Sequence, residues 1–119
     1  MNNKFPAEHL ELIESINNVL KNVQNKFDIY QNNCFTERSA EFFCLELNGE
    51  AGELANLEKK HWKGKEIPDF RFYDEAADVF IALMNYCNAR GIDIENAVIN
   101  KLNTIENKRA ELQARGELY

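Results

Sequence analysis

The sequence has few of the residues that form cross-links or metal sites with sulfur and nitrogen ligands. It contains three cysteines and two histidines among 119 residues. Cys34, Cys44 and Cys87 are odd in number and widely spaced, and no C-x-x-C pair occurs. A disulfide framework and a zinc site are therefore not expected. The pattern favours reduced, mostly buried thiols in a cytoplasmic protein.

Basic charge and long apolar runs are also scarce. The chain has 14 basic and 20 acidic residues, which gives a formal net charge of -6. Binding to nucleic acid or to an anionic membrane needs a basic face, so neither is expected as the main task. The N-terminal stretch MNNKFPAEHLELIESINN has no uninterrupted apolar segment. We therefore expect neither a signal peptide nor a membrane span.

Apolar residues recur every three or four positions along most of the chain, and no run alternates with a period of two. This spacing predicts four helices: from about Pro6 to Tyr30, from a cap at Thr36 to about Lys60, from a cap at Asp69 through Phe70 to Arg90, and from a cap at Asp93 to about Ala114. Gly91 is expected to end the third helix. The predicted fold class is all-α, with residues 1–119 forming one four-helix, bundle-like domain.

The third predicted helix contains the stretch VFIALM, residues 79–84, which is apolar on every side. A helix without a polar face is usually covered all round. In so small a domain a second subunit is the expected cover. The sequence therefore predicts oligomerisation through helix packing, as a homodimer or a homotetramer.

The second predicted helix carries three glutamates on one side. At about 100° per residue, Glu46, Glu50 and Glu53 fall within about 60° of one another. They flank an apolar line that includes Phe43 and Leu54. A solvated acidic face is the ordinary meaning of glutamates at this spacing, and it remains an alternative.

The third predicted helix carries a second acidic pair, Glu75 and Asp78, beside apolar residues. Antiparallel packing of the two helices would bring this pair to face Glu50 and Glu53. Four converging carboxylates cannot all stay ionised without cations. Ligation by oxygen alone is what Mg²⁺ prefers, with Mn²⁺ as an alternative. The sequence therefore predicts a Mg²⁺ site between the two helices.

Two glycines, Gly49 and Gly52, lie beside these acids although each costs about 1 kcal/mol relative to alanine within a helix. Their missing side chains would let a ligand or another helix approach the backbone. Tight helix packing without any function explains them equally well.

Basic residues supply candidate contacts to an anionic substrate. Lys101 and Arg109 lie near the inward line of the fourth predicted helix, where they could hold phosphate oxygens. They could equally extend outward into solvent. Lys60 belongs to a lysine-rich segment around Trp62, whose ring could stack on a base. Exposed lysines and a packing role for the tryptophan are the simpler alternatives.

These residues resemble a known family. The E-x-x-E of Glu50 and Glu53, the E-x-x-D of Glu75 and Asp78, and the continuation DVFIALMNYCNARGIDIENAVINKLNTIENKR are similar to the MazG-like all-α nucleotide pyrophosphohydrolases, relatives of the dimeric dUTPases. The resemblance covers roughly residues 40–110. One position departs from it, because the family often has a doubled acid, E-E-x-x-E, where this chain has Gly49. Glu46, one turn earlier, is a candidate replacement as an outer ligand or base.

The resemblance implies a function. Such proteins use Mg²⁺ to cleave nucleoside triphosphates to the monophosphate and pyrophosphate, and they assemble as dimers or tetramers. By this likeness the four acids would bind Mg²⁺, and Glu50 or Glu53 would deprotonate the attacking water. Lys101 and Arg109 would stabilise charge on the phosphate oxygens. Removal of unwanted nucleotides is the implied role, and attack at the α-phosphorus is likewise implied.

Two other classes of function remain open. A di-iron carboxylate bundle uses Glu-x-x-His on two helices, whereas only Glu58 and His61 have that spacing here. The missing acid at Gly49 favours another class, a non-catalytic helical module. Such a module would bind a partner protein and keep a degenerate acidic site.

Overall fold

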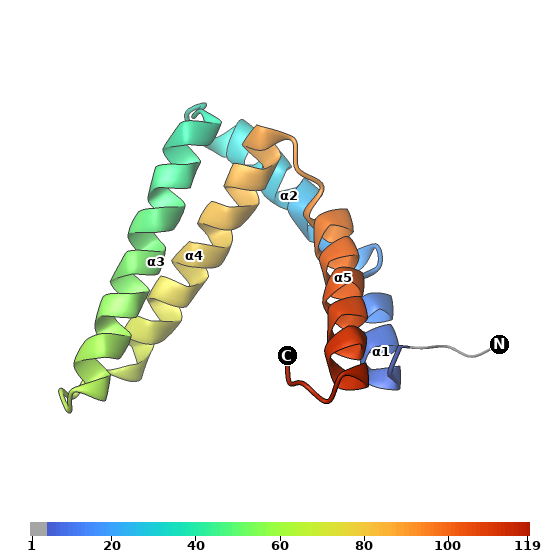
Figure 1. The fold of residues 1–119 in the computed structure, drawn as a ribbon. Coiled ribbons are helices and arrows are strands. Elements are labelled where there is room, and N and C mark those ends of the chain that lie inside the picture. The colour runs from blue at the N-terminus through green and yellow to red at the C-terminus, as the bar shows by residue number, and fades with distance from the viewer. Residues whose placement is uncertain (1–4) are drawn as a thin grey trace. The chain divides into compact units, whose positions relative to one another are not determined.

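The computed structural model describes residues 5–119, and every regular element in that range is a helix. The predicted all-α fold class is confirmed. Five helices follow one another along the chain (Figure 1): α1 (Ala7–Ile16), α2 (Val19–Cys34), α3 (Ala40–Trp62), α4 (Asp69–Arg90) and α5 (Ile94–Ala114).

The helix predicted from Pro6 to Tyr30 is divided in two, which corrects the sequence-based boundaries. The break falls at Asn17 and Asn18, and Asn18 has a positive φ of 66°. Asparagine tolerates this left-handed conformation better than most residues. The apolar spacing runs through the break unchanged, so periodicity gave no sign of it. The second part, α2, then extends beyond Tyr30 to Cys34.

Two predicted N-terminal caps are also corrected. Helix α3 begins at Ala40, and the hydroxyl of Ser39 accepts a hydrogen bond from the Phe42 N–H at 3.2 Å. The predicted cap, Thr36, lies before the helix. Asp69 is the first residue of α4 rather than its cap, and Pro68 takes the cap position with extended backbone angles. A residue preceding a helix must leave helical geometry, and both Ser39 and Pro68 do so.

The turn between α4 and α5 follows the sequence prediction. Gly91 ends α4 with a left-handed φ of 75°, which costs glycine little because it has no Cβ. Asp93 then caps α5 by accepting a hydrogen bond from the Asn96 N–H at 3.1 Å.

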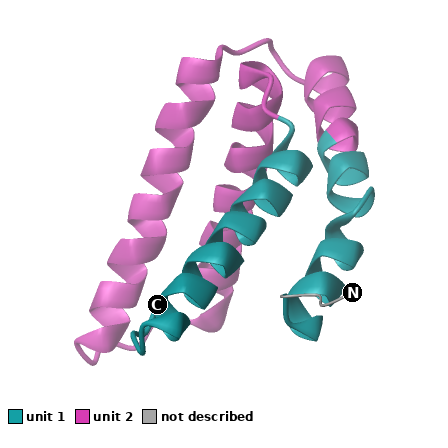
Figure 2. Ribbon diagram, turned by 45° about the vertical axis from the view of Figure 1, so that its right-hand side comes forward, with its two compact units in different colours: residues 1–24, 93–119 teal, residues 25–92 magenta. Residues whose placement is uncertain are grey.

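The chain forms two compact units (Figure 2), one made of the residues up to Gln24 with Asp93–Tyr119, the other of Asn25–Ile92. In the second unit α3 and α4 lie side by side as an antiparallel hairpin. The end of α2 joins this unit, where Phe27 contacts Phe80 with 5.9 Å between ring centroids. In the first unit α1 packs against α5.

The two units bury different kinds of side chain. Among the described residues, the buried apolar ones all belong to the unit 25–92: Phe43, Leu57, Ala82, Met84 and Cys87. The other unit buries His9, Gln24 and Glu95, which are polar. The hairpin therefore contains the apolar core of the described chain.

Burial also corrects one sequence-based expectation. Cys87 is buried, but Cys34 and Cys44 are exposed, so the thiols are free yet not mostly buried. Within VFIALM, Phe80 and Ile81 remain 43% exposed. The described chain alone therefore does not cover this helix on every side.

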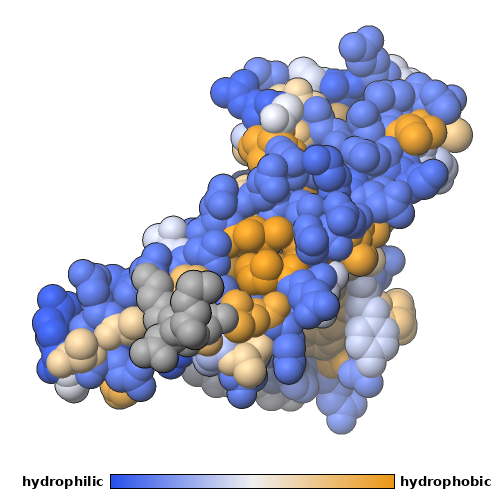
Figure 3. Space-filling model, turned by 90° about the vertical axis from the view of Figure 1, so that its right-hand side faces the viewer, coloured by the Kyte–Doolittle hydropathy of each residue, from blue (hydrophilic) through white to orange (hydrophobic). Residues whose placement is uncertain are grey.

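Large apolar side chains reach the surface at many places, and Figure 3 shows them as patches on a mostly hydrophilic face. Leu45, Phe70 and Tyr73 are among the most exposed. No helix within residues 5–119 combines the length and the apolar character needed to cross a membrane.

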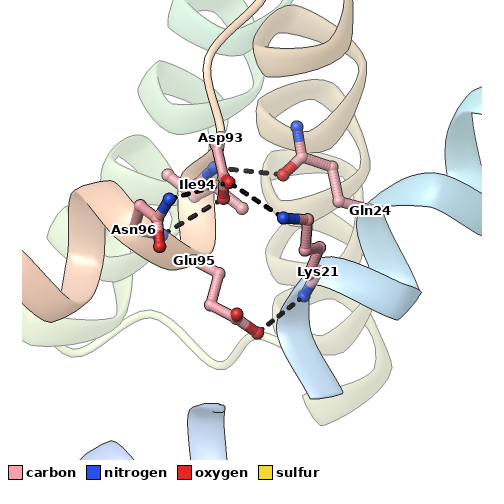
Figure 4. Close-up of polar contacts among 6 residues, drawn as sticks. All are labelled: Lys21, Gln24, Asp93, Ile94, Glu95 and Asn96. Atoms are coloured by element: carbon pink, nitrogen blue, oxygen red, sulfur yellow. Dashed lines mark hydrogen bonds and ion pairs between the residues drawn. The ribbon is translucent and has the colours of Figure 1, made fainter. Parts of the chain in front are cut away.

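The N-termini of α2 and α5 cap one another within the first unit (Figure 4). The buried carboxylate of Glu95 accepts a hydrogen bond from the Lys21 N–H at 3.1 Å, and the amide oxygen of Gln24 accepts one from the Ile94 N–H at 3.0 Å. Each side chain satisfies a donor that the first turn of the other helix leaves without a partner. Lys21 and Asp93 add an exposed ion pair at 3.5 Å, which contributes little.

This reciprocal capping predicts a loss of stability when Glu95 is replaced. Glu95→Ala removes the acceptor for the Lys21 N–H and should lower the free energy of unfolding by about 1–2 kcal/mol. Glu95→Gln keeps an acceptor oxygen and should cost clearly less. Urea denaturation followed by circular dichroism measures both. Equal losses for the two variants would show that the hydrogen bond to Lys21 is not what Glu95 contributes.

Candidate metal centre

Three carboxylates meet between the helices of the hairpin. Glu50 projects from α3, and Glu75 and Asp78 project from α4. One carboxylate oxygen from each lies within 4.8 Å of the other two. The antiparallel pairing of α3 with α4 brings this about, because residues three apart on α4 share the face that meets Glu50. We call these three residues the acid triad.

The triad is partly buried, and it has oxygens without partners. Glu50, Glu75 and Asp78 are each of intermediate exposure. The Oε2 atoms of Glu50 and Glu75 are buried, and when both carboxyls are ionised neither has a hydrogen-bond donor among the described residues. A buried carboxylate oxygen without a donor is costly. A cation between the helices would satisfy these oxygens.

The acids disturb one another's protonation. Burial, hydrogen bonding with Glu50 and Glu53, and the charges of both raise the pKa of Glu75 to about 7. Burial also raises the pKa of Glu50, and the charges of Asp78 and Glu53 act in the same direction, while the hydrogen bond with Glu75 opposes them. Without a cation, the pair Glu50 and Glu75 therefore holds a proton near neutral pH.

The donors are of the kind that hard divalent cations such as Mg²⁺, Mn²⁺ and Ca²⁺ bind. Every atom that the triad offers is a carboxylate oxygen, the ligand type that Mg²⁺ and Mn²⁺ prefer. No histidine joins a cluster of potential ligands within residues 5–119. His61, the histidine of the Glu58–His61 spacing, instead contacts the ring of Phe72 at 5.7 Å between centroids. The geometry thus gives no support to a di-iron centre.

The other predicted acids lie beside the triad on α3. Glu53 is exposed, and its charge and hydrogen bonding reach Glu75 and Glu50. Glu46 is exposed one helical turn before Glu50. Glu53 therefore lies at the rim of the triad, exposed to water.

The predicted phosphate-binding residues of α5 lie in the other compact unit. Lys101 and Arg109 are both exposed. The guanidinium of Arg109 is paired with Glu106 on the same helix, with its Nε 3.0 Å from the Glu106 Oε1. A phosphate that bound Arg109 would compete with this pair. The role of both residues toward the acids stays a prediction.

Lys60 and Trp62 lie in the last turn of α3, which extends to Trp62, slightly beyond the end predicted at about Lys60. Both are exposed, Trp62 to 84%. They follow Glu50 by about 15 and 18 Å along the helix axis. A cavity of about 600 Å³ opens at the adjoining turn, lined by residue 61 and residues 64–69. Neither Lys60 nor Trp62 lines it, and their contact with substrate stays a prediction.

The two glycines of α3 stand in open space. A Cβ added at Gly49 or Gly52 would meet no atom of the described chain within 4 Å. Close packing of another helix of the same compact unit therefore does not explain them. Approach of a ligand or of a second subunit remains as an explanation.

Gly52→Ala tests this explanation. Alanine at this position should stabilise the isolated chain by up to about 1 kcal/mol, because it favours the helix and meets no obstacle. If a ligand or a second subunit approaches the backbone there, the same variant should lose activity or assembly. Thermal unfolding, light scattering and an activity assay measure these effects. A variant that is destabilised as a dilute monomer would contradict the open geometry.

A polar residue that sequence analysis did not single out is buried on α4. Asn85 interrupts the apolar run IALMNYC and is 9% exposed. The interruption was visible in the sequence, but its surroundings were not.

Comparisons of the chain with models of protein families, with curated proteins and with solved structures each gave no significant match.

Proposed function

We propose that the protein is a Mg²⁺-dependent nucleoside triphosphate pyrophosphohydrolase that releases a nucleoside monophosphate and pyrophosphate. The observation that supports this most strongly is the acid triad, with two buried carboxylate oxygens that have no donor among the described residues when the acids are ionised. The type of reaction is inferred from the resemblance of its two acidic pairs to those of the MazG-like pyrophosphohydrolases. The proposed role is removal of unwanted nucleotides in the cytoplasm.

Glu50, Glu75 and Asp78 would hold the cation. When bound, Mg²⁺ lowers the pKa of water and offsets the negative charge of phosphate oxygens. The structure fits this need because the triad offers oxygens alone and carries more negative charge than it can keep without a cation.

Glu53 is the proposed general base, with Glu50 as the alternative. Its carboxylate is exposed and borders the triad, so it can take a proton from an attacking water. The water oxygen forms a bond to the α-phosphorus, and the bond from that phosphorus to the bridging oxygen breaks. Pyrophosphate departs with the bridging oxygen and its electron pair. Glu46, one helical turn before Glu50, is the proposed support for this general base.

Basic side chains are proposed to hold the phosphates. Lys101 and Arg109 are the candidates on α5, and Lys60 is the candidate on α3. Cationic groups around a triphosphate stabilise charge that builds on its oxygens. Trp62 offers an exposed ring beside Lys60.

We also propose that the chain assembles as a homodimer or homotetramer through α4. Phe70, Tyr73 and Ile81 are exposed large apolar residues of this helix, and their spacing places them on one side of it. Exposed apolar area of this kind typically marks an interface. Tyr73→Glu should shift the protein toward monomer in size-exclusion chromatography with light scattering. Wild-type protein that is already monomeric at high concentration would refute the assembly.

A substrate panel tests the proposed reaction. Purified protein is incubated with Mg²⁺ and each common ribonucleoside and deoxyribonucleoside triphosphate, and released pyrophosphate is measured. Chromatography of the nucleotide product separates a monophosphate from a diphosphate. We expect monophosphate and pyrophosphate in equal amounts, and no product in EDTA. Release of a diphosphate and single phosphate, or no turnover of any nucleotide, would refute the proposal.

A further inference from the structure

A second cavity, of about 270 Å³, lies near the start of α3 within the same compact unit as the acid triad. We call it the aromatic cleft. Its lining comes from α2, α3, α4 and the segment that joins α2 to α3, and includes Gln31, Phe35, Arg38, Phe42, Phe43 and Asn85. Glu46 also lines the cleft. Because Glu46 precedes Glu50 by one helical turn, or about 6 Å, the cleft adjoins the triad along α3.

Asn85 lines this cleft and has an unused hydrogen-bonding atom. Its Nδ2 donates to the Oε1 of Gln31 at 3.4 Å. Its Oδ1 is buried and accepts no hydrogen bond from the described residues. Such an oxygen costs about 1–3 kcal/mol when it stays without a donor. A donor that enters the cleft would remove this cost.

The aromatic residues of the cleft suit a planar ligand. Phe43 is buried, while Phe35 and Phe42 are exposed. The guanidinium of Arg38 lies over the ring of Phe42, 4.7 Å from its centroid. Phe35 is held edge-on against Tyr30, with 5.0 Å between centroids. All nucleic-acid bases can stack on aromatic rings, because every base has a flat π-face.

We infer that the aromatic cleft binds the base of the nucleotide and that Asn85 selects among bases. The inference rests on the proposed function for the identity of the ligand as a nucleotide. The Oδ1 of Asn85 and the carboxylate of Glu46 are both acceptors, so they favour a base that presents an exocyclic amine. Cytosine and adenine carry such an amine where uracil and hypoxanthine carry a carbonyl. A sugar would bridge the base in the cleft to phosphates at the triad.

The test uses nucleosides, because they have no phosphate and bind without a metal. Cytidine against uridine and adenosine against inosine are matched pairs that differ by an amine in place of a carbonyl. Binding is measured in EDTA from shifts of protein NMR signals during titration. In each pair that binds, we expect the amine-bearing nucleoside to bind about tenfold more tightly, the effect of one well-made hydrogen bond.

Two variants assign the preference to Asn85. Asn85→Leu keeps the size of the side chain and removes the amide, so it should abolish the preference within each pair. Asn33→Ala is the matched control, since Asn33 is an exposed asparagine of α2 that lines neither the cleft nor the neighbouring cavity, and it should keep the preference. If Asn85→Leu fails to fold, Phe42→Leu replaces it and should weaken binding of all nucleosides by about tenfold through lost stacking.

The outcomes separate the inference from the proposed function. Failure of every nucleoside to bind, a preference for the carbonyl-bearing member, or an unchanged preference in Asn85→Leu would overturn the inference, and so would unchanged binding in Phe42→Leu. Selective binding that depends on Asn85 would support it even if the substrate panel showed no pyrophosphate release. In that case the proposed reaction alone would be wrong.

Discussion

Asp78→Ala should reduce Mg²⁺-dependent release of pyrophosphate by about a thousandfold or more, the size of loss expected when a charge-stabilising group is removed from the reaction centre. Asp78 belongs to the acid triad, with one carboxylate oxygen within 4.8 Å of oxygens from Glu50 and Glu75. Without it, two carboxylates remain to hold the cation. Glu53→Ala should also abolish turnover, because it removes the proposed base. Steady-state kinetics over a range of Mg²⁺ concentrations measure both effects.

The control for Asp78→Ala is Asp74→Ala. Asp74 lies on the same helix, is exposed and is not part of the triad. It should retain nearly full activity. Both variants should keep the helical circular dichroism spectrum of the wild-type protein. Normal hydrolysis of triphosphates by Asp78→Ala or Glu53→Ala would show that the site has been wrongly assigned.

The stability of the metal-free protein should fall as the pH rises from about 5 to 8. The pKa of Glu75 is raised to about 7 by burial and by Glu50 and Glu53, against an ordinary value of 4.5. Between these two values the folded chain keeps a proton that the unfolded chain has released. Stability then decreases with pH, because it rises with pH only where the unfolded state binds more protons.

Added Mg²⁺ should reverse this trend. By the proposed function the cation would bind the ionised triad of the folded chain, and a hundredfold excess of a ligand over its dissociation constant stabilises a protein by about 2.7 kcal/mol. The melting temperature in EDTA and in Mg²⁺, recorded at several pH values, measures the two effects. We expect the largest difference between the two conditions above pH 7.

Glu75→Gln separates this effect from general charge repulsion. Glutamine cannot ionise, so the variant in EDTA should lose most of the fall in stability and should no longer respond to Mg²⁺. Glu58→Gln removes the same charge from an exposed position of α3 outside the triad, and it should behave like the wild-type protein. A Glu75→Gln variant that keeps the wild-type pH dependence would show that the triad does not hold the proton.

Local signals in the sequence were enough to predict the turn that follows α4. Gly91 has the left-handed backbone that favours glycine, and Asp93 makes the expected capping bond to Asn96. Both depend on residues close in sequence. The approach of Glu50 to Glu75 and Asp78 follows from helical periodicity and from the short connection that makes α3 and α4 antiparallel.

Features that depend on competition between neighbouring residues were harder to predict. Ser39 and Thr36 are both good capping residues, and only the folded chain shows that Ser39 caps α3. The positive φ of Asn18 divides α1 from α2 although the apolar pattern continues through it. In each case two local structures were compatible with the same pattern.

Hydrogen bonds between helices that no short connection joins were not predicted. Gln31, the hydrogen-bonding partner of Asn85, is 54 residues away in the sequence. The same holds for the Glu95 acceptor of the Lys21 N–H, which is 74 residues away. Periodicity places Lys101 and Arg109 on one side of α5, but it did not predict that Arg109 pairs with Glu106.

Calorimetric titration of the protein with MgCl₂ at pH 8 tests most directly whether the acids between α3 and α4 form a cation site. We predict saturable binding to the wild-type protein, and loss of that binding in Glu50→Gln and in Asp78→Asn, with Asp74→Asn unaffected. Absence of binding to the wild-type protein, or equal binding by all of these variants, would contradict the site.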